Sequence, residues 1–258
     1  MPVYNEEKNI GHLLEEAAEI FEKNNIDAEI IVVNDGSTDD TRRICEELSK
    51  MYRLIKLINH EVNRGYSQAV STGVKQARND YVILMDSDGQ FDVKDISAFL
   101  KKYEQTGTDV IFGCRKDRKG SFPRRLMSIF MTWLSNILFG MKFKDTQCAF
   151  QFIKTDLLKG LDIESPSFQV PTEIKIKLSS IIGNYEQISV VHNERKGGRT
   201  AFKALKVIPP TILFLLKLRL KVSFLKRVVT DSRVSVSREE KSKIQSYVRL
   251  SACFVCGL

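Results

Sequence analysis

The stretch YVILMDSDGQ, residues 81–90, decides the fold class because a run of apolar residues ends abruptly in two carboxylates and an amide. Its first five residues are apolar or β-prone, which is typical of a central strand in a parallel sheet. Ligands of open α/β sheets bind at the carboxyl ends of such strands. The side chains of Asp86, Asp88 and Gln90 supply oxygen ligands for a hard cation such as Mg²⁺ or Mn²⁺. A solvated turn after the strand is the alternative interpretation.

A second predicted strand, residues 29–33, also ends in polar residues. It leads into residues 34–41, where Gly36 permits a tight turn and Ser, Thr and Asp residues cap the helix that follows. Capping does not require Asp35, which precedes the turn. Upstream, residues 2–7 open a helix whose apolar positions keep a period of about 3.6 residues. We therefore expect three polar clusters at the same edge of one α/β sheet.

These motifs resemble those of the inverting GT-A glycosyltransferases of family 2. The motifs are PVYNE at 2–6, NDGSTDDT at 34–41, NRG at 63–65 and DSD at 86–88. One branch of this family is represented by dolichyl-phosphate mannose and glucose synthases. The segments that resemble this branch are Gln90, 113–115, the basic cluster 116–125, 145–150 and 194–200. The resemblance covers roughly residues 1–200 and implies a GT-A fold, a Rossmann-like mixed sheet flanked by helices.

Two features depart from the family's pattern. Members usually have an apolar first strand before the PVYNE-like motif, whereas here Met1 stands directly before that motif. The sheet is therefore expected to lack most of an inner strand. Asn34 stands where many relatives have Asp, but the next residue, to which the family assigns the nucleobase contact, is kept as Asp35.

The resemblance and the chemistry of a nucleotide-sugar together predict the site. The metal ligands are expected to be Asp86, Asp88 and Gln90. The catalytic residues are expected to be Asp86, Asp88, Arg115 and Asp145. The nucleotide-sugar is expected to contact Pro2, Tyr4, Glu6, Asp35, Asp86 and Arg115. Arg124 and Arg195 are expected to bind the acceptor phosphate, because a guanidinium offers two parallel donors to phosphate oxygens.

The acceptor determines whether a general base is needed. A sugar hydroxyl requires one, whereas a phosphate monoester is already anionic, with a second pKa of about 6. Asp145 is the candidate base for a hydroxyl acceptor; otherwise it would orient substrate or an acceptor-side arginine. The leading prediction is a metal-dependent, inverting hexosyltransferase that uses a UDP- or GDP-sugar and a polyprenyl (dolichyl or undecaprenyl) phosphate.

Two alternatives remain. The first is a transferase of the same fold that acts on a glycan hydroxyl in polysaccharide or cell-wall assembly, for which a Gln-x-x-Arg-Trp motif is expected. The single tryptophan, Trp133, follows Met and Thr, so that motif is absent. The second is a non-catalytic nucleotide-sugar-binding protein, against which the intact carboxylates argue. No Gly-x-Gly-x-x-Gly follows a predicted strand, which disfavours a dinucleotide oxidoreductase.

The formal charge of +8 is concentrated near the C-terminus, where residues 195–230 carry ten Lys or Arg and no Asp or Glu. No aromatic-rich nucleic-acid module accompanies this stripe, so no nucleic-acid partner is expected. Residues 208–224 are apolar but interrupted by three basic residues, which suits an anionic membrane surface better than a span. A helix packed on the domain with its lysines snorkelling is equally compatible. We expect a cytoplasmic protein, peripheral on the cytosolic face of a membrane or bound to a membrane-spanning partner.

A second apolar stripe lies over residues 126–139. The resemblance implies a lipid-chain groove there, with Arg124 and Arg125 at its phosphate end, whereas ordinary core packing explains the stripe equally well. The predicted organisation is a catalytic domain over 1–202, a basic amphipathic segment over 203–230 and an unassigned tail over 231–258. The five cysteines lack a zinc-ligand pattern and are expected to be reduced thiols.

Overall fold

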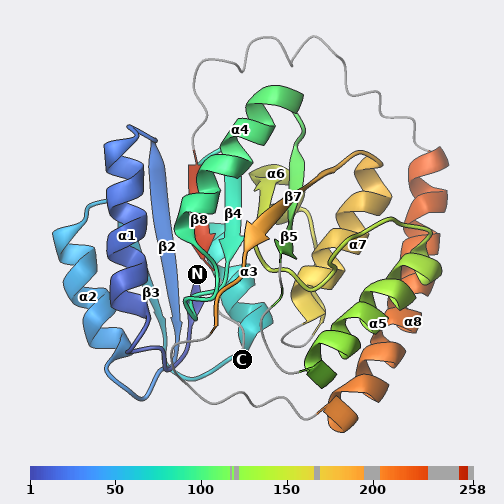
Figure 1. Ribbon diagram of the computed structural model, residues 1–258, viewed down its shortest axis with the longest axis horizontal. Coiled ribbons are helices and arrows are strands. Elements are labelled where there is room, and N and C mark those ends of the chain that lie inside the picture. The colour runs from blue at the N-terminus through green and yellow to red at the C-terminus, as the bar shows by residue number, and fades with distance from the viewer. Residues whose placement is uncertain (117, 119–121, 166–168, 195–203, 232–249, 255–258) are drawn as a thin grey trace.

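The computed structural model describes residues 1–116, 118, 122–165, 169–194, 204–231 and 250–254, with the backbone alone described for 204–208, 223–231 and 250–254. These residues form one mixed sheet with helices on both of its faces (Figure 1). The α/β class predicted from the sequence is confirmed.

The strands and helices follow the expected alternation. The strands are β1 (Pro2–Val3), β2 (Ala28–Asp35), β3 (Ile55–His60), β4 (Tyr81–Met85), β5 (Val110–Lys116), β6 (Gln151–Lys154), β7 (Glu186–Val191) and β8 (Leu250–Phe254). The helices are α1 (Ile10–Lys23), α2 (Thr41–Met51), α3 (Tyr66–Gln76), α4 (Ile96–Thr106), α5 (Phe122–Phe139), α6 (Thr155–Lys159), α7 (Val170–Ile182) and α8 (Ala204–Asp231), with the 3₁₀ turn η1 (Val93–Asp95) before α4.

The described strands lie in the order β3, β2, β8, β4, β6, β5, β7, with β1 also paired to β2. All pairings are parallel except those of β6, which runs antiparallel to both β4 and β5. Because β2, β4 and β5 run in the same direction, their carboxyl ends meet at one edge of the sheet. This edge carries the polar clusters that the sequence predicted.

The position between β2 and β4 is shared by two short strands from distant parts of the sequence. β3 occupies one edge of β2, so β1 and β8 lie along its other edge. β8 pairs with the first half of β2 and with the whole of β4, and β1 follows with Pro2 opposite Val33. The sequence predicted an incomplete inner strand, but not that residues 250–254 would fill the position.

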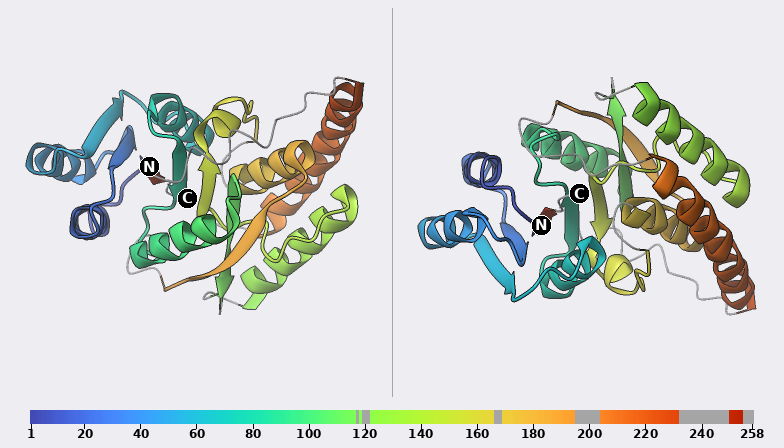
Figure 2. Two further views of the ribbon diagram at one scale, coloured as in Figure 1. Left: turned by 90° about the horizontal axis from the view of Figure 1, so that it is seen from above. Right: turned by 90° about the horizontal axis from the view of Figure 1, so that it is seen from below.

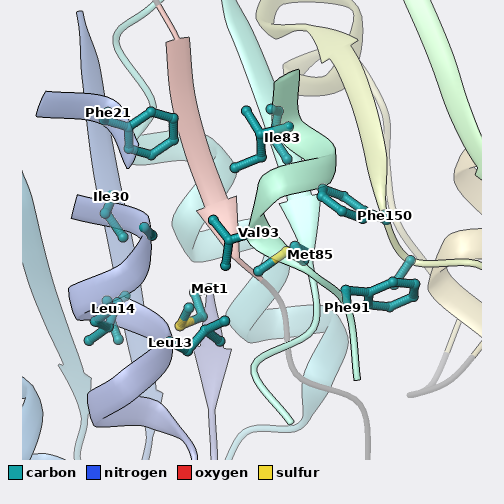
Figure 3. Close-up of a cluster of buried hydrophobic side chains, with 14 of the residues drawn as sticks. Met1, Leu13, Leu14, Phe21, Ile30, Ile83, Met85, Phe91, Val93 and Phe150 are labelled. Carbon is teal, nitrogen blue, oxygen red and sulfur yellow. The ribbon is translucent and has the colours of Figure 1, made fainter. Parts of the chain in front are cut away.

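Two apolar clusters, one on each face of the sheet, follow from the alternation of side chains along the strands. In β4, Tyr81, Ile83 and Met85 join the cluster that includes α1, α2 and α4, whereas Val82 and Leu84 join the cluster with α3, α6 and α7. Both views in Figure 2 show helices on either side of the sheet, and Figure 3 shows the first cluster with β8 running through it. These two cores hold β4, and so the residues that follow it, from both faces.

The helices α5 and α8 pack against each other at one end of the molecule, and α8 also packs on α7 (Figure 1). Among the residues that the structure describes, no helix is both long and apolar enough to cross a membrane. Core packing does not explain most of the predicted stripe over residues 126–139. Phe139 lies in the core and Leu134 and Leu138 pack against it, while Leu126, Trp133 and Ile137 are exposed.

We predict that deleting residues 250–258 lowers the free energy of unfolding by several kcal/mol. The deletion removes the main-chain hydrogen bonds of β8 to both β2 and β4, each worth roughly 1 kcal/mol. Urea unfolding followed by circular dichroism would measure the loss. Deleting residues 255–258 alone is the matched control and should change little. Equal stability of both truncated proteins and the full chain would contradict the contribution of β8.

Candidate active site

The loop after β4 holds all three predicted metal ligands, Asp86, Asp88 and Gln90. Asp88 is buried, and its carboxylate accepts a hydrogen bond from the main-chain N–H of Gln90 at 3.1 Å. The hydroxyl of Tyr66, the first residue of α3, donates to Asp86 at 3.2 Å. Gly89 has a φ of 71°, a left-handed conformation that favours glycine and lets the loop turn back over the strand end. The two carboxylates are therefore fixed at the carboxyl end of β4.

The same loop is tied to the end of β7. The side-chain amide of Gln90 donates to the Asn193 carbonyl at 3.2 Å, and the Asn193 N–H donates to the Gln90 carbonyl at 2.7 Å. Next to this contact, Phe91 and His192 form an isolated antiparallel bridge. The segment that leads towards the predicted phosphate ligand Arg195 thus begins beside the predicted metal loop. Arg195 itself lies outside the described residues.

The oxygen atoms of this loop suit a hard divalent cation. Asp86 and Asp88 offer carboxylates and Gln90 offers an amide oxygen, the ligand types that Mg²⁺ and Mn²⁺ prefer. Within the described part of the chain, no group of three His, Cys, Asp or Glu side chains is arranged to hold a metal ion. A cation here would thus take its remaining ligands from Gln90, water or a substrate phosphate.

Asp35 has a structural function that the sequence did not predict. Its buried carboxylate accepts hydrogen bonds from the main-chain N–H groups of Arg64 (3.0 Å) and Gly65 (2.8 Å), and lies 2.6 Å from Nδ1 of His60. Nε2 of His60 lies 3.1 Å from the hydroxyl of Thr72. Asp35 therefore holds the turn that begins α3. The sequence indicated only that capping of α2 does not need this carboxylate, whereas the turn before α3 does need it.

The N-terminal motif packs on the loop after β2. The main-chain N–H of Glu6 donates to the Thr41 hydroxyl at 2.8 Å, and the Asn5 side chain accepts from the N–H of Thr38 at 2.8 Å. Of the predicted nucleotide ligands, Glu6 is buried and Tyr4 is exposed, whereas Pro2 is buried within β1. The motif therefore contributes both to the sheet and to its carboxyl edge.

A buried ion-pair cluster links β5 to the loop before β6. Arg115 donates to both carboxylate oxygens of Asp145, from Nε at 2.7 Å and from Nη2 at 2.9 Å, and Arg118 donates to the same carboxylate at 2.6 Å. Burial by itself would raise the pKa of Asp145, but Arg115 and Lys175 more than offset that effect and hold the pKa below its usual value. Asp145 is therefore an ionised anchor for two arginines.

Lys175 supports this cluster from α7. Its fully buried Nζ donates to the main-chain carbonyls of Asp145 (2.6 Å) and Gly113 (3.2 Å) and lies 5.3 Å from the centre of the Phe112 ring. The ammonium group thus joins β5 to the loop that carries Asp145. The sequence offered no signal for this function, which depends on the packing of α7 beside β5 and the loop before β6.

His192 is a second group near the cluster that the sequence did not predict. The side chain is buried, and its Nδ1 has no hydrogen-bond partner in the described part of the chain. Burial, together with the guanidinium groups of Arg115 and Arg124, lowers the pKa of His192 to about 4. The imidazole is therefore neutral at neutral pH and adds no charge to the arginine-rich side of the site.

The structure brings together most of the predicted site residues that it describes. Asp86 is close enough to Arg115 to influence its pKa, and Arg124, exposed at the start of α5, influences that of His192. The result is an edge with two differently charged parts. Carboxylates after β4 form one part, and the arginines around Asp145 form the other.

The chain resembles known proteins both in sequence and in fold. A sequence profile described as Glycosyl transferase family 2 matches residues 1–156. An uncharacterized protein of Methanocaldococcus jannaschii is 32% identical over 229 residues, which are 83% of this chain and 97% of that protein. A dolichyl-phosphate beta-glucosyltransferase of Trichomonas vaginalis is 33% identical over 176 residues, 62% of this chain and 54% of that enzyme. The chain thus spans about half the length of this enzyme.

A solved structure shares the architecture. The glucosyl-3-phosphoglycerate synthase of Mycobacterium tuberculosis, crystallised with Mn²⁺, uridine diphosphate and glucosyl-3-phosphoglycerate, matches with a TM-score of 0.64 over 84% of this chain and 77% of its own. Sequence identity is 16%, so the likeness is one of fold. The predicted GT-A fold is confirmed by this match together with the family profile.

We predict that Asp145→Asn destabilises the protein at neutral pH, by about 3–5 kcal/mol, because it leaves buried cations without their carboxylate. The folded-state pKa of Asp145 is depressed, so its contribution is fully present above the unfolded pKa of about 3.9 and is lost as pH falls through the folded pKa. The stability difference between wild type and variant should therefore stay constant from about pH 7 to about pH 5 and shrink as the pH falls further, towards about pH 2.

Urea unfolding across this pH range would measure that difference. Asp156→Asn, a change at an exposed carboxylate on α6, is the control and should behave like wild type throughout. A stability difference that stays constant down to low pH would mean that the carboxylate is not held ionised by its neighbours.

Proposed function

The chain belongs to glycosyl transferase family 2 and is a glycosyltransferase, and we propose that it transfers a hexose from a UDP- or GDP-sugar to a polyprenyl phosphate. We base the choice of acceptor on the ion pairs that Asp145 forms with Arg115 and Arg118. Similarity to a dolichyl-phosphate beta-glucosyltransferase supports the same acceptor class.

The hydrogen bonds between Asp145 and the arginines bear on the identity of the acceptor, because only a hydroxyl acceptor needs a general base. A hydroxyl acceptor needs a general base with a free carboxylate or imidazole and a pKa near the working pH. Asp145 has a lowered pKa and both of its oxygens accept hydrogen bonds from arginine, so it is a poor base. A phosphate monoester is an anion at neutral pH and attacks without deprotonation. In our proposal Asp145 orients arginines instead of removing a proton.

The arginines would bind the phosphates. Held by Asp145, Arg115 and Arg118 have limited freedom, and guanidinium groups pre-oriented in this way stabilise charge that grows on a leaving diphosphate at little reorganisation cost. We assign Arg115 to the donor, and Arg124 and Arg195 to the acceptor phosphate. Asp35 and Glu6, with Tyr4, are assigned to the nucleoside.

The loop after β4 is assigned to a divalent cation, Mg²⁺ or Mn²⁺, with Asp86, Asp88 and Gln90 as its ligands. Such a cation neutralises charge on the diphosphate leaving group. The oxygen donors of the loop fit this ion, and the Mn²⁺ in the crystals of the mycobacterial synthase agrees with the assignment. Tyr66, through its hydrogen bond to Asp86, would orient one ligand.

We also propose that the protein works at the cytosolic face of a membrane, where a polyprenyl phosphate is available. The described part of α8 supports this location. Its exposed residues include Leu213, Leu216 and Leu220 together with the basic residues Lys217 and Arg219, a composition suited to an anionic surface.

A partition assay tests the acceptor. The purified protein is incubated with radiolabelled UDP- or GDP-hexoses, a polyprenyl phosphate in detergent and Mg²⁺ or Mn²⁺, and the mixture is then extracted with organic solvent. We predict acid-labile label in the organic phase with at least one donor. Label that appears only in a water-soluble oligosaccharide when a glycan is supplied would move the assignment to the hydroxyl acceptor.

The proposed metal site predicts that Asp88→Ala abolishes transfer and that EDTA does so reversibly. Both changes remove neutralisation of the leaving diphosphate. Gln90→Ala should be milder, because a neutral ligand contributes less to the charge of the site. Asp156→Ala, at an exposed position on α6, is the control. Transfer at the wild-type rate in excess EDTA would rule out the metal-dependent mechanism.

A further inference from the structure

The helix α5 exposes more large apolar side chains than a surface helix of a globular domain usually does. It buries three small polar residues, Ser128, Thr132 and Ser135, together with Met131 and Phe139. Six of its large apolar side chains point outwards, with exposures from 41% to 75%: Phe122, Leu126, Ile129, Phe130, Trp133 and Ile137. From Leu126 onwards these residues recur every three or four positions, so they form one stripe along the helix.

Specific contacts hold α5 in this orientation. Its inner face is hydrogen-bonded to the segment 143–147, which contains Asp145. Ser128 donates to the side chain of Gln147, the hydroxyls of Thr132 and Thr146 lie 3.1 Å apart, and the Asn136 side chain exchanges two hydrogen bonds of 2.9 Å with the main chain of Phe143. A half-turn rotation of α5 would bury its apolar stripe but break these bonds. The exposed stripe is therefore built into the fold.

The charges around the stripe favour one kind of partner. The helix carries Arg124 and Arg125 in its first turn and no acidic residue. The adjacent α8 exposes Lys217 and Arg219, and also Lys221, which is ion-paired with Glu164. A second copy of the chain would bring like charges together on this face. An anionic lipid surface complements them. Aromatic side chains such as Phe130 and Trp133, whose rings stack with centroids 5.8 Å apart, suit the boundary between headgroups and acyl chains.

We propose that the outer face of α5 inserts into an anionic bilayer, with the helix lying in the plane of the membrane. This inference rests on the proposed function, in which the acceptor is a membrane lipid. It deepens that function by assigning the surface through which the site meets the lipid. Because the inner face of α5 is bonded to segment 143–147, insertion leaves the cluster of Asp145, Arg115 and Arg118 about one helix diameter, roughly 10 Å, from the bilayer. A lipid phosphate at the headgroup level is then near the arginines, while its chain stays in the membrane.

The single tryptophan of the chain reports on this surface directly. Trp133 is 55% exposed, so its emission should shift to the blue when vesicles of phosphatidylcholine and phosphatidylglycerol are added, without donor or acceptor. Brominated acyl chains should quench this emission. Vesicles of phosphatidylcholine alone should bind more weakly, because the basic residues then lack anionic partners.

Paired variants give the control. Ile129→Glu with Ile137→Glu places charge in the stripe and should weaken vesicle binding about tenfold or more, since affinity scales with the apolar area buried. Met51→Glu with Ile181→Glu makes the same exchange at exposed apolar residues on α2 and α7, and should bind like wild type. Circular dichroism checks that both variants are folded.

Several outcomes would overturn the inference. Unquenched Trp133 emission, or equal binding by the two double variants, would show that α5 does not insert. Sedimentation that reveals a dimer whose Trp133 is shielded without lipid would assign the stripe to a second copy. Transfer to a polyprenyl phosphate in detergent micelles separates this inference from the function. If transfer persists but the protein does not bind vesicles, the insertion of α5 is wrong and the proposed function is unaffected. If the protein binds vesicles but forms no polyprenyl-phosphate product, the proposed acceptor is wrong and the membrane-binding surface is retained.

Discussion

The buried carboxylate of Asp145 is the interaction around which the basic side of the site is organised. It binds Arg115 at the end of β5 and Arg118 just beyond it, and the main chain of Asp145 accepts a hydrogen bond from Lys175 on α7. The segment around it is also bonded to the inner face of α5. One carboxylate thus sets the position of two guanidinium groups, and its loop links three parts of the fold that are distant in sequence.

The two parts of the site carry opposite charges, and each part suits one of the ligands that we propose. The negative part suits a cation, and the positive part suits phosphate groups. Asp86 and Asp88 leave the end of β4 negative and suited to a cation. Around Asp145, two arginines bind the carboxylate and Lys175 binds the main-chain carbonyl, so three positive charges surround one negative charge. A nucleotide diphosphate bridges these parts naturally, because its oxygens bind both a cation and arginine. An anionic acceptor meets less repulsion on the arginine side than it would beside the carboxylates.

The sequence predicted those features that depend on local pattern. The run of residues 81–85 and the carboxylates after it define β4 and its loop, and the family's motifs predicted the fold. Features that depend on tertiary packing were not predictable. The helical period over residues 126–139 identified an apolar stripe but not the side on which it would lie. The hydrogen bonds of Thr132 and Asn136 to the loop that follows α5 decide that side, and the apolar period does not reveal them. Lys175 and the pairing of β8 with β4 depend on contacts remote in sequence.

The pH dependence of transfer to a polyprenyl phosphate tests the central claim most directly, namely that an ionised acceptor and oriented arginines replace a general base. In the wild type, kcat/KM should rise with the second ionisation of the acceptor phosphate, at about pH 6. Asp145→Asn should lower kcat/KM at every pH, because its arginines lose their anchor, but leave that apparent pKa unchanged. If the rise of kcat/KM with pH that the wild type shows is absent from Asp145→Asn, then Asp145 acts as a base, which would contradict the account.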